Sequence, residues 1–295
     1  SQGYSSIQKH QQEVLDTQVK LSTGKRVNAP SDDPVAMTQI HSLNRTMNTI
    51  DQYAKNGEYA KSQLVLEETS INDTIDSLQR ARELGIQMLN GTYTDSDKLT
   101  TAAEIDQIIL QVKNQMNYTN SDGEKLFAGN RVFADNAFIE DPNNSGYYTY
   151  IGSPNADDLA TGGGDEQDVD ALFGSRFIQV GFDADNIFIP NDMGDPSQVR
   201  ITDNGAKVFT ADSSRNAANL DPTTGVDNNI LNVLVNMSNL LKGQASNAIA
   251  VENGDPADLP PDLEETIEMM DNSIENLSLV RAEIGGRQNR IESQY

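Results

Sequence analysis

Few side chains in this sequence are of the types that carry enzyme chemistry. The chain has no cysteine, which excludes disulfides, thiolate metal ligands and cysteine nucleophiles. Its two histidines, His10 and His41, each stand alone in a helical stretch, and no H-E-x-x-H pattern places two ring nitrogens on one helical face. No serine lies in a G-x-S-x-G pattern. We therefore assign no catalytic residue and expect the protein not to be an enzyme.

The acidic residues are plentiful, but their spacing does not predict a metal or phosphate site. The stretch YTNSDGEKLFAG is the nearest match to a calcium loop, yet Tyr118 occupies the first ligand position and Gly129 the position of the bidentate glutamate. The segment FDADN could hold a hard cation weakly, although a turn with solvated acids is the better interpretation. The three glycines Gly162–Gly164 precede acids that would repel a phosphate. We expect no metal and no cofactor.

The overall charge limits the partners that the protein can have. Forty-five acidic and 21 basic residues give the chain of 295 residues a net charge of −24. A surface that neutralises phosphates needs a basic face, so we expect no nucleic acid and no anionic membrane as partner. No run approaches the 18 consecutive apolar residues that predict a membrane-spanning helix.

Narrow apolar stripes at helical spacing dominate both ends of the chain. They run through Ile7–Leu21, Ile40–Met88, Leu99–Met116 and Leu263–Ile291, with a shorter apolar run at Ile230–Ile249. The steps of three, four and seven residues predict helices, and the longest should end at the turn signal Asn90-Gly91. So narrow a stripe is typical of coiled-coil or bundle packing.

The helical period is lost in the middle of the chain. The short stretches YYTYIG, RFIQVGF and NIFIP predict strands between turn residues, and AKVF is a further candidate strand. We therefore predict an α+β fold: an elongated helical bundle or coiled-coil rod built from both chain ends, residues 1–130 and 227–295. Residues 131–226 would form an inserted, acidic, β-rich domain.

A compact block of turn residues, LSTGKRVNAPSDDPVAM, separates the first two helical stripes. Gly24 suits the residue just after a helix end. Asp33 is placed to cap the next helix, with Pro34 in its first turn, where the missing N–H costs nothing. The block therefore ends one helix, links it to the next helix and begins that helix, and it needs no ligand to do so.

The same block closely resembles a pattern of the flagellin superfamily, Leu-Ser-x-Gly-x-Arg-(Ile/Val) followed by Asp-Asp-Pro. Other stretches agree with superfamily segments in order and position: GEKLFAGNRVF at 123–133, ITDNGAKVF at 201–209 and VRAEIGGRQNRIES at 280–293. The resemblance covers the helical parts at both ends and one stretch of the middle. It also implies that most of the terminal helices, which form the inner tube of the assembled structure, are missing from this sequence.

This resemblance implies a secreted structural protein of the extracellular bacterial flagellum, at the junction between hook and filament. It would form a ring with copies of itself, with hook-associated protein 1 on the hook side and flagellin on the filament side. An export chaperone would bind the missing C-terminal part. The alternatives are a flagellin filament subunit or, from another class, a secreted adhesin or hydrolase with its activity in the β domain.

Charged and polar residues of the two end motifs are the candidates for contacts between chain segments or between subunits. They are Arg26, Asp32, Asp33, Arg281, Glu283, Arg287, Asn289 and Arg290. The simpler interpretation is that the acids cap a helix and the arginines are solvated. Exposed ion pairs contribute about 0–1 kcal/mol each to stability. Such contacts would therefore fix how the segments or subunits align more than how tightly they bind. Gly285-Gly286 within the same helix suggests a close helix approach or a bend.

Overall fold

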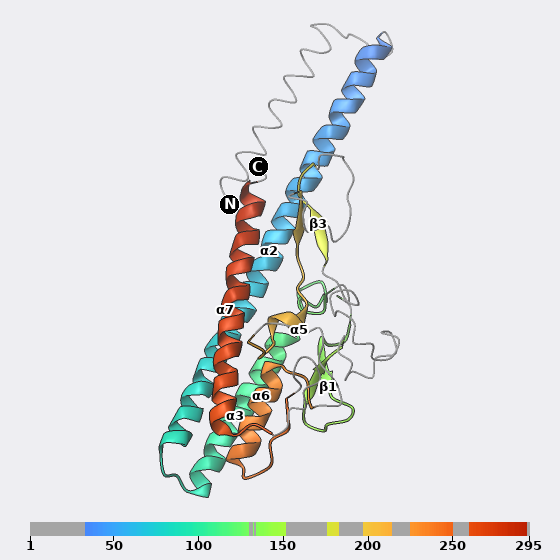
Figure 1. Ribbon diagram of the computed structural model, residues 1–295. Coiled ribbons are helices and arrows are strands. Elements are labelled where there is room, and N and C mark those ends of the chain that lie inside the picture. Colours follow the sequence, from blue (N-terminus) through green and yellow to red (C-terminus); the bar gives the residue numbers. More distant parts are fainter. Residues whose placement is uncertain are drawn as a thin grey trace. The chain divides into compact units, whose positions relative to one another are not determined.

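The computed structural model describes residues 33–129, 132, 134–151, 176–182, 197–213, 225–249 and 260–293 (Figure 1). Its helices are α2 (Pro34–Asn90), α3 (Asp95–Met116), α5 (Gly205–Val208), α6 (Ile230–Leu241) and α7 (Leu263–Ser293). Its strands are β1 (Phe138–Glu140), β2 (Tyr148–Tyr150), β3 (Phe177–Gln179) and β4 (Gln198–Arg200). The predictions made for Ile7–Leu21, Gly24, Gly162–Gly164 and the stretch NIFIP lie outside the described residues.

The α+β class and the long helices drawn from both ends of the chain are confirmed. α2, α3 and α7 follow the predicted apolar stripes, and α2 ends at Asn90 as predicted. β2 and β3 lie within the predicted stretches YYTYIG and RFIQVGF. The apolar run at Ile230–Ile249 is helical only as far as Leu241.

One predicted strand is wrong, because AKVF belongs to the short helix α5. The Asn204 side chain accepts a hydrogen bond from the Ala206 N–H at 2.9 Å, which caps the first turn. Gly205 lies so close to the Phe127 carbonyl oxygen that a Cβ would approach it to 2.7 Å. The local cap and this close approach select a helical turn over the extended form that β-branched and aromatic residues suggest.

The predicted start of α2 is confirmed in detail. The Asp33 carboxylate accepts hydrogen bonds from the N–H groups of Val35 and Ala36, both at 3.1 Å. Pro34 is the first helical residue, where no N–H is required. α3 begins with a capping box, in which the Thr94 side chain and the Asp97 side chain each accept from the other residue's N–H.

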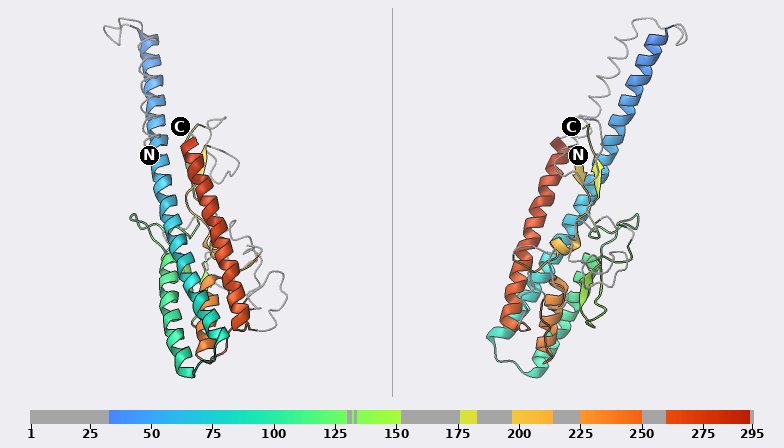
Figure 2. Two further views of the ribbon diagram at one scale, coloured as in Figure 1. Left: turned by 90° about the vertical axis from the view of Figure 1, so that its left-hand side faces the viewer. Right: turned by 45° about the vertical axis from the view of Figure 1, so that its right-hand side comes forward.

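The chain divides into two compact units, and α2 and α7 each contribute to both. Figure 2 shows α2 and α7 in two further views, each drawn as one continuous helix. Within the described residues, the first unit holds 33–62, 177–182, 197–200 and 286–293. The second unit holds the rest of α2 and α7 together with α3, α5, α6, β1 and β2.

The second unit is a helical bundle of α2, α3, α6 and α7. Gly85 of α2 lies at a close approach, because a Cβ there would be 2.7 Å from Met237 Cε on α6 and 3.1 Å from Ile267 Cγ1 on α7. A Cβ at Gly285 or Gly286 would have no described atom within 4 Å, so close packing inside the described structure does not explain this pair. Of these three glycines, Gly85 is the one that serves a close helix contact within the described residues.

The four strands form two separate two-stranded antiparallel ribbons. In the β1–β2 ribbon Phe138 pairs with Tyr150 and Glu140 with Tyr148. In the β3–β4 ribbon Phe177 pairs with Arg200 and Gln179 with Gln198. A two-stranded ribbon has two outer edges, and isolated ribbons are marginally stable in water. Each ribbon therefore depends on the elements that cover its edges.

None of the described helices is both long enough and apolar enough to cross a lipid bilayer. No described group of three or more histidine, aspartate or glutamate side chains is arranged to hold a metal ion.

Candidate functional site

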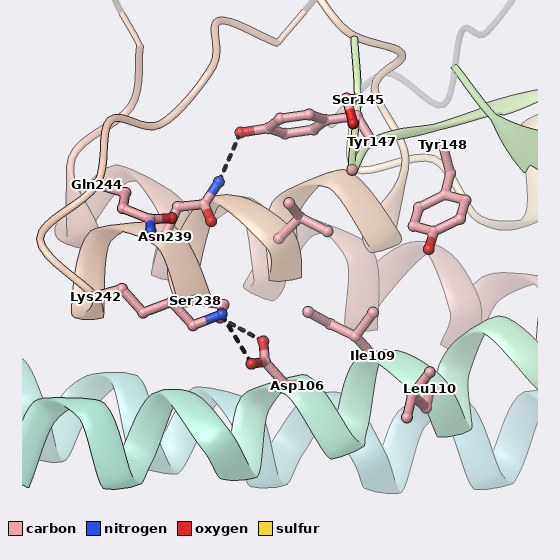
Figure 3. Close-up of a pocket in the computed structure, with 12 residues that line it drawn as sticks. Asp106, Ile109, Leu110, Ser145, Tyr147, Tyr148, Ser238, Asn239, Lys242 and Gln244 are labelled. Atoms are coloured by element: carbon pink, nitrogen blue, oxygen red, sulfur yellow. Dashed lines mark hydrogen bonds and ion pairs between the residues drawn. The ribbon is translucent and has the colours of Figure 1, made fainter. Parts of the chain in front are cut away.

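The second unit contains an open cavity of about 450 Å³ between α3, α6 and the turn that joins β1 to β2 (Figure 3). Ile109, Leu110 and Val235 supply apolar side chains to its wall. Leu110 is 52% exposed. Tyr147 and Tyr148 line the side formed by the ribbon.

The polar groups of this cavity are engaged with one another. Figure 3 shows Asp106 of α3 facing Lys242 and Ser238 of α6, with the Lys242 Nζ–Asp106 Oδ2 distance at 2.8 Å. The Tyr147 hydroxyl donates to Asn236 Oδ1 at 2.7 Å and accepts from Asn239 Nδ2 at 3.2 Å. Burial raises the pKa of Tyr147, which keeps this hydroxyl a donor. These groups join α3, α6 and the ribbon, and none of them forms a nucleophile–base pair.

A row of asparagines on α6 was not identified from the sequence as a site. Asn229, Asn232, Asn236 and Asn239 follow one another at steps of three, four and three residues, which places them on one helical face. Asn232 is fully buried; its Oδ1 accepts from the Tyr148 N–H at 2.8 Å and its Nδ2 donates to the Tyr148 carbonyl at 2.8 Å. The spacing itself is the signal that could have revealed this row.

The Asn232 amide thus takes the place of a neighbouring strand. In an antiparallel pair, every second residue directs its N–H and C=O away from the partner strand. Tyr148 is such a residue, because the neighbouring ladder bond runs from the Asp141 N–H to the Tyr147 carbonyl at 2.8 Å. One carboxamide has both a donor and an acceptor, so it can satisfy both outward groups of one residue.

The opposite edge of the β1–β2 ribbon is covered in the same way. Asn117, which ends α3, accepts from the Phe138 N–H at 2.8 Å and donates to the Phe138 carbonyl at 3.4 Å. Farther along β2, the buried Asp227 carboxylate accepts from the Tyr150 N–H at 3.1 Å and from the Thr149 hydroxyl. Side chains therefore cover both edges of this ribbon and remove it as a template for pairing with another chain.

The β3–β4 ribbon of the first unit is held by the predicted motif arginines. Arg290 donates from Nη2 to the Gln198 carbonyl at 3.0 Å, and Arg287 donates from Nη1 to the Arg200 carbonyl at 3.3 Å. Both carbonyls lie on the outer edge of β4, because the neighbouring Ser197 carbonyl accepts from the Val180 N–H of the β3 side at 2.7 Å. The two arginines are thus edge-covering groups for β4.

α2 covers the other edge of this ribbon. Asn56 donates from Nδ2 to the Gln179 carbonyl at 2.8 Å, and Tyr53 packs edge-on against Phe182 with ring centroids 4.9 Å apart. Lys61 of α2 pairs with Glu292 of α7 at 3.2 Å, which ties the two helices together beside the ribbon. The first unit is therefore a ribbon clasped between one segment of α2 and the last turns of α7.

The other predicted contact residues lie at different places. Arg281 donates from Nη1 to Asn72 Oδ1 of α2 at 3.0 Å, a contact inside the second unit. Glu283 and Asn289 are exposed on α7, and Asp33 caps α2. Arg26 and Asp32 lie outside the described residues. The structure thus brings Arg287 and Arg290 to one ribbon and leaves the proposed contact between the two end motifs a prediction.

Comparison with known proteins places this arrangement in context. The model of the bacterial flagellin N-terminal helical region matches residues 1–131. A flagellar hook-associated protein 3 from Escherichia coli is 28% identical over 292 residues, 99% of this chain and 78% of that protein. The chain is thus similar to proteins of the flagellin superfamily, in its first 131 residues to the family model and over nearly its whole length to a hook-associated protein 3. Its resemblance to superfamily motifs at both ends is thereby confirmed.

Two further comparisons bear on how far the superfamily likeness extends. A flagellar hook-associated protein 3 from Salmonella typhimurium is 34% identical over 133 residues, which are 45% of this chain and 42% of that protein. The solved structure of the flagellar junction protein FlgL from Legionella pneumophila is 15% identical and covers 86% of this chain and 99% of that one, with a TM-score of 0.57. This structural likeness shows a shared fold.

Proposed function

We propose that this protein is a structural component of the bacterial flagellum that joins the hook to the filament. The observation that supports the proposal most directly is the similarity to the Escherichia coli hook-associated protein 3 over 99% of the chain. The protein would form a ring between hook-associated protein 1 and flagellin, outside the cell, after export with the help of a chaperone. In this role the protein works by contact and carries out no chemical reaction.

We further propose how the predicted residues divide between internal and external roles. Arg287 and Arg290 donate to β4 within the chain, so they shape the surface without contacting a neighbour through those groups. Glu283 and Asn289 are exposed on the same helix and are the better candidates for contacts with neighbouring subunits. The helical parts of the chain would face these neighbours, and the inserted acidic segment 131–226 would face outward.

Deletion of the gene in its flagellated host, followed by electron microscopy and a blot of the culture medium, tests the proposed function. Hooks without filaments, together with flagellin released into the medium, are the expected result. Loss of filaments without secreted flagellin would identify the chain as a filament subunit. Intact, motile filaments would overturn both functions and direct attention to an adhesin or hydrolase activity.

Complementation of the deletion tests the division of roles among the α7 residues. The charge-reversing Glu283→Arg and the truncating Asn289→Ala are expected to reduce filament attachment, and Asn289→Ala should leave the circular dichroism spectrum and melting of the purified protein unchanged. Lys61→Met, which removes an ion pair inside the first unit, is the matched control and should support full motility. Normal filaments with both exposed variants would remove these residues from the subunit contact.

A further inference from the structure

The sequence contains four Asn-Gly pairs, at Asn56, Asn90, Asn204 and Asn253. Asparagine before glycine is chemically labile, because glycine has no Cβ to hinder attack by its own backbone nitrogen. The structure describes three of these pairs and places them in very different surroundings, whereas Asn253 lies outside the described residues. The surroundings decide which of the three can react in the folded protein.

Two of the described pairs are held in place by hydrogen bonds. Asn56 lies within α2; its Nδ2 donates to the Gln179 carbonyl at 2.8 Å, and its Oδ1 accepts from Gln52 at 2.9 Å. Asn204 is 4% exposed, and its Oδ1 accepts from the Ala206 N–H at 2.9 Å. The attacking nitrogen of that pair, Gly205 N, already donates to the Phe127 carbonyl at 3.0 Å.

The third pair has none of this protection. Asn90 is the last residue of α2 and Gly91 opens the turn to α3, and both residues are exposed. Within the described part of the chain, the Asn90 side chain makes no hydrogen bond. Helix ends fray, so the backbone here reaches reactive geometries without opening the core.

The packing of the turn also favours glycine at position 91. A Cβ on Gly91 would lie 2.0 Å from the Tyr93 ring, so any other residue would displace that ring or the turn. Glycine therefore suits this connection to the capping box at Thr94, because it leaves room for the Tyr93 ring.

We propose that Asn90 is a site of spontaneous deamidation in the folded protein. The Gly91 nitrogen attacks the Asn90 side-chain carbonyl carbon; the new C–N bond forms as the old one breaks, and ammonia leaves with the Gly91 proton. Water then opens the cyclic imide at either carbonyl and leaves aspartate or isoaspartate. The product places a carboxylate at the negative end of α2, whose last turn has no basic residue to balance it.

Incubation of the purified full chain at neutral and mildly alkaline pH, followed by trypsin and mass spectrometry, tests this proposal. The three pairs fall on separate tryptic peptides, Glu83–Lys98, Asn56–Lys61 and Ile201–Lys207. The Asn90 peptide should gain the mass of an amide-to-acid conversion at least about tenfold faster than the other two, which react only from locally opened forms. In denaturant, all three should react at similar rates.

Two variants make the test specific. Asn90→Gln should abolish the early mass change and the isoaspartate signal, while the other two peptides keep their rates. Asn90→Asp should reproduce the part of any change in melting temperature that comes from the aspartate product, and isoaspartate accounts for the remainder. Equal rates at Asn90 and Asn204 in the folded protein, or an unchanged early signal in Asn90→Gln, would overturn the assignment.

Discussion

The two ribbons of this molecule have the same topology and are held by different chemistry. In the β1–β2 ribbon Phe138 and Tyr150 are almost fully buried, and asparagine amides together with the Asp227 carboxylate cover its edges. The residues of β3 are half-buried, whereas Gln198 and Val199 of β4 are buried, and Arg287 and Arg290 donate to the outer edge of β4. Each ribbon thus contains a largely buried strand, and the two ribbons differ in the chemical groups that cover their edges.

The difference follows from what each side chain can do. A buried carboxamide satisfies an N–H and a C=O together and carries no charge that must be desolvated. A guanidinium only donates, so on a strand edge it serves carbonyls and not N–H groups; here Arg290 is half-buried and Arg287 is buried. Removing one amide should therefore cost the β1–β2 ribbon more stability than removing one arginine costs the β3–β4 ribbon.

The largest expected effect comes from Asn232→Leu. The substitution keeps the volume but removes the hydrogen bonds of Asn232 to the Tyr148 N–H and to the Tyr148 and Asp227 carbonyls. Both carbonyls keep a hydrogen bond from Asn229, so the Tyr148 N–H is the group left without a partner. A loss of roughly 1–3 kcal/mol in the free energy of unfolding is the expected result. Urea denaturation followed by circular dichroism measures it.

Asn239→Leu is the matched control for that experiment. Asn239 lies on the same face of α6, is only half-buried, and donates one hydrogen bond, to the Tyr147 hydroxyl. Its replacement should cost less than about 1 kcal/mol. Equal losses in the two variants would show that helix propensity or packing, and not the amide pairing, determines the stability of this region.

Asn117→Ala tests the opposite edge of the same ribbon. The amide of Asn117 exchanges two hydrogen bonds with Phe138, one of them long at 3.4 Å, and the residue is only partly buried. A loss of roughly 1–2 kcal/mol is expected, because water can reach part of the exposed edge. Asn114→Ala, at an exposed position of α3, is the control and should leave the unfolding midpoint unchanged.

The β3–β4 ribbon should lose less stability when one of its covering arginines is replaced. Arg287→Met and Arg290→Met each remove a donor to a β4 carbonyl, with an expected cost of about 1 kcal/mol or less for each. Hydrogen–deuterium exchange of the peptide that contains 197–200 should accelerate in the double variant. Arg290→Lys, which retains a donor, should recover part of the protection. Unchanged exchange in the double variant would show that the arginines do not hold this ribbon.

The sequence predicted the elements with long periodic signals and missed those whose partners are distant along the chain. α2 and α7 follow from their apolar stripes, and the Asp33 cap follows from local residue types. β4 was not predicted, because three residues carry no periodicity and its edge is held by Arg287 and Arg290, far away in sequence.

The candidate site was predicted in its residues but not in their partners. The resemblance of the C-terminal motif to the flagellin superfamily drew attention to Arg287 and Arg290 and suggested charge pairs, and the structure shows in addition that each arginine donates to a backbone carbonyl of β4. The spacing of the asparagines on α6 can be seen in the sequence, but their role depends on a distant ribbon. Asn232 and its partner Tyr148 are 84 residues apart along the chain. The types of residue in a sequence do not reveal which backbone groups a side chain will bond.

The smallest expected effect concerns the pH dependence of the free energy of unfolding, through Tyr147 beside the β1–β2 ribbon. Burial raises the pKa of Tyr147 above its usual value of about 10, so the unfolded chain releases this proton at lower pH than the folded protein. Stability from this group is therefore complete below pH of about 10 and declines as the pH rises toward the folded-state pKa. Tyr147→Phe removes the titrating group, so unfolding free energies measured in this range should fall less steeply with pH than in the unsubstituted protein. Because the variant also loses the hydrogen bonds to Asn236 and Asn239, its stability at neutral pH must be measured alongside. The same slope in both proteins would mean that the hydroxyl does not keep its proton through burial, and that the amide face of α6 tolerates a charge that its neutral chemistry is expected to exclude.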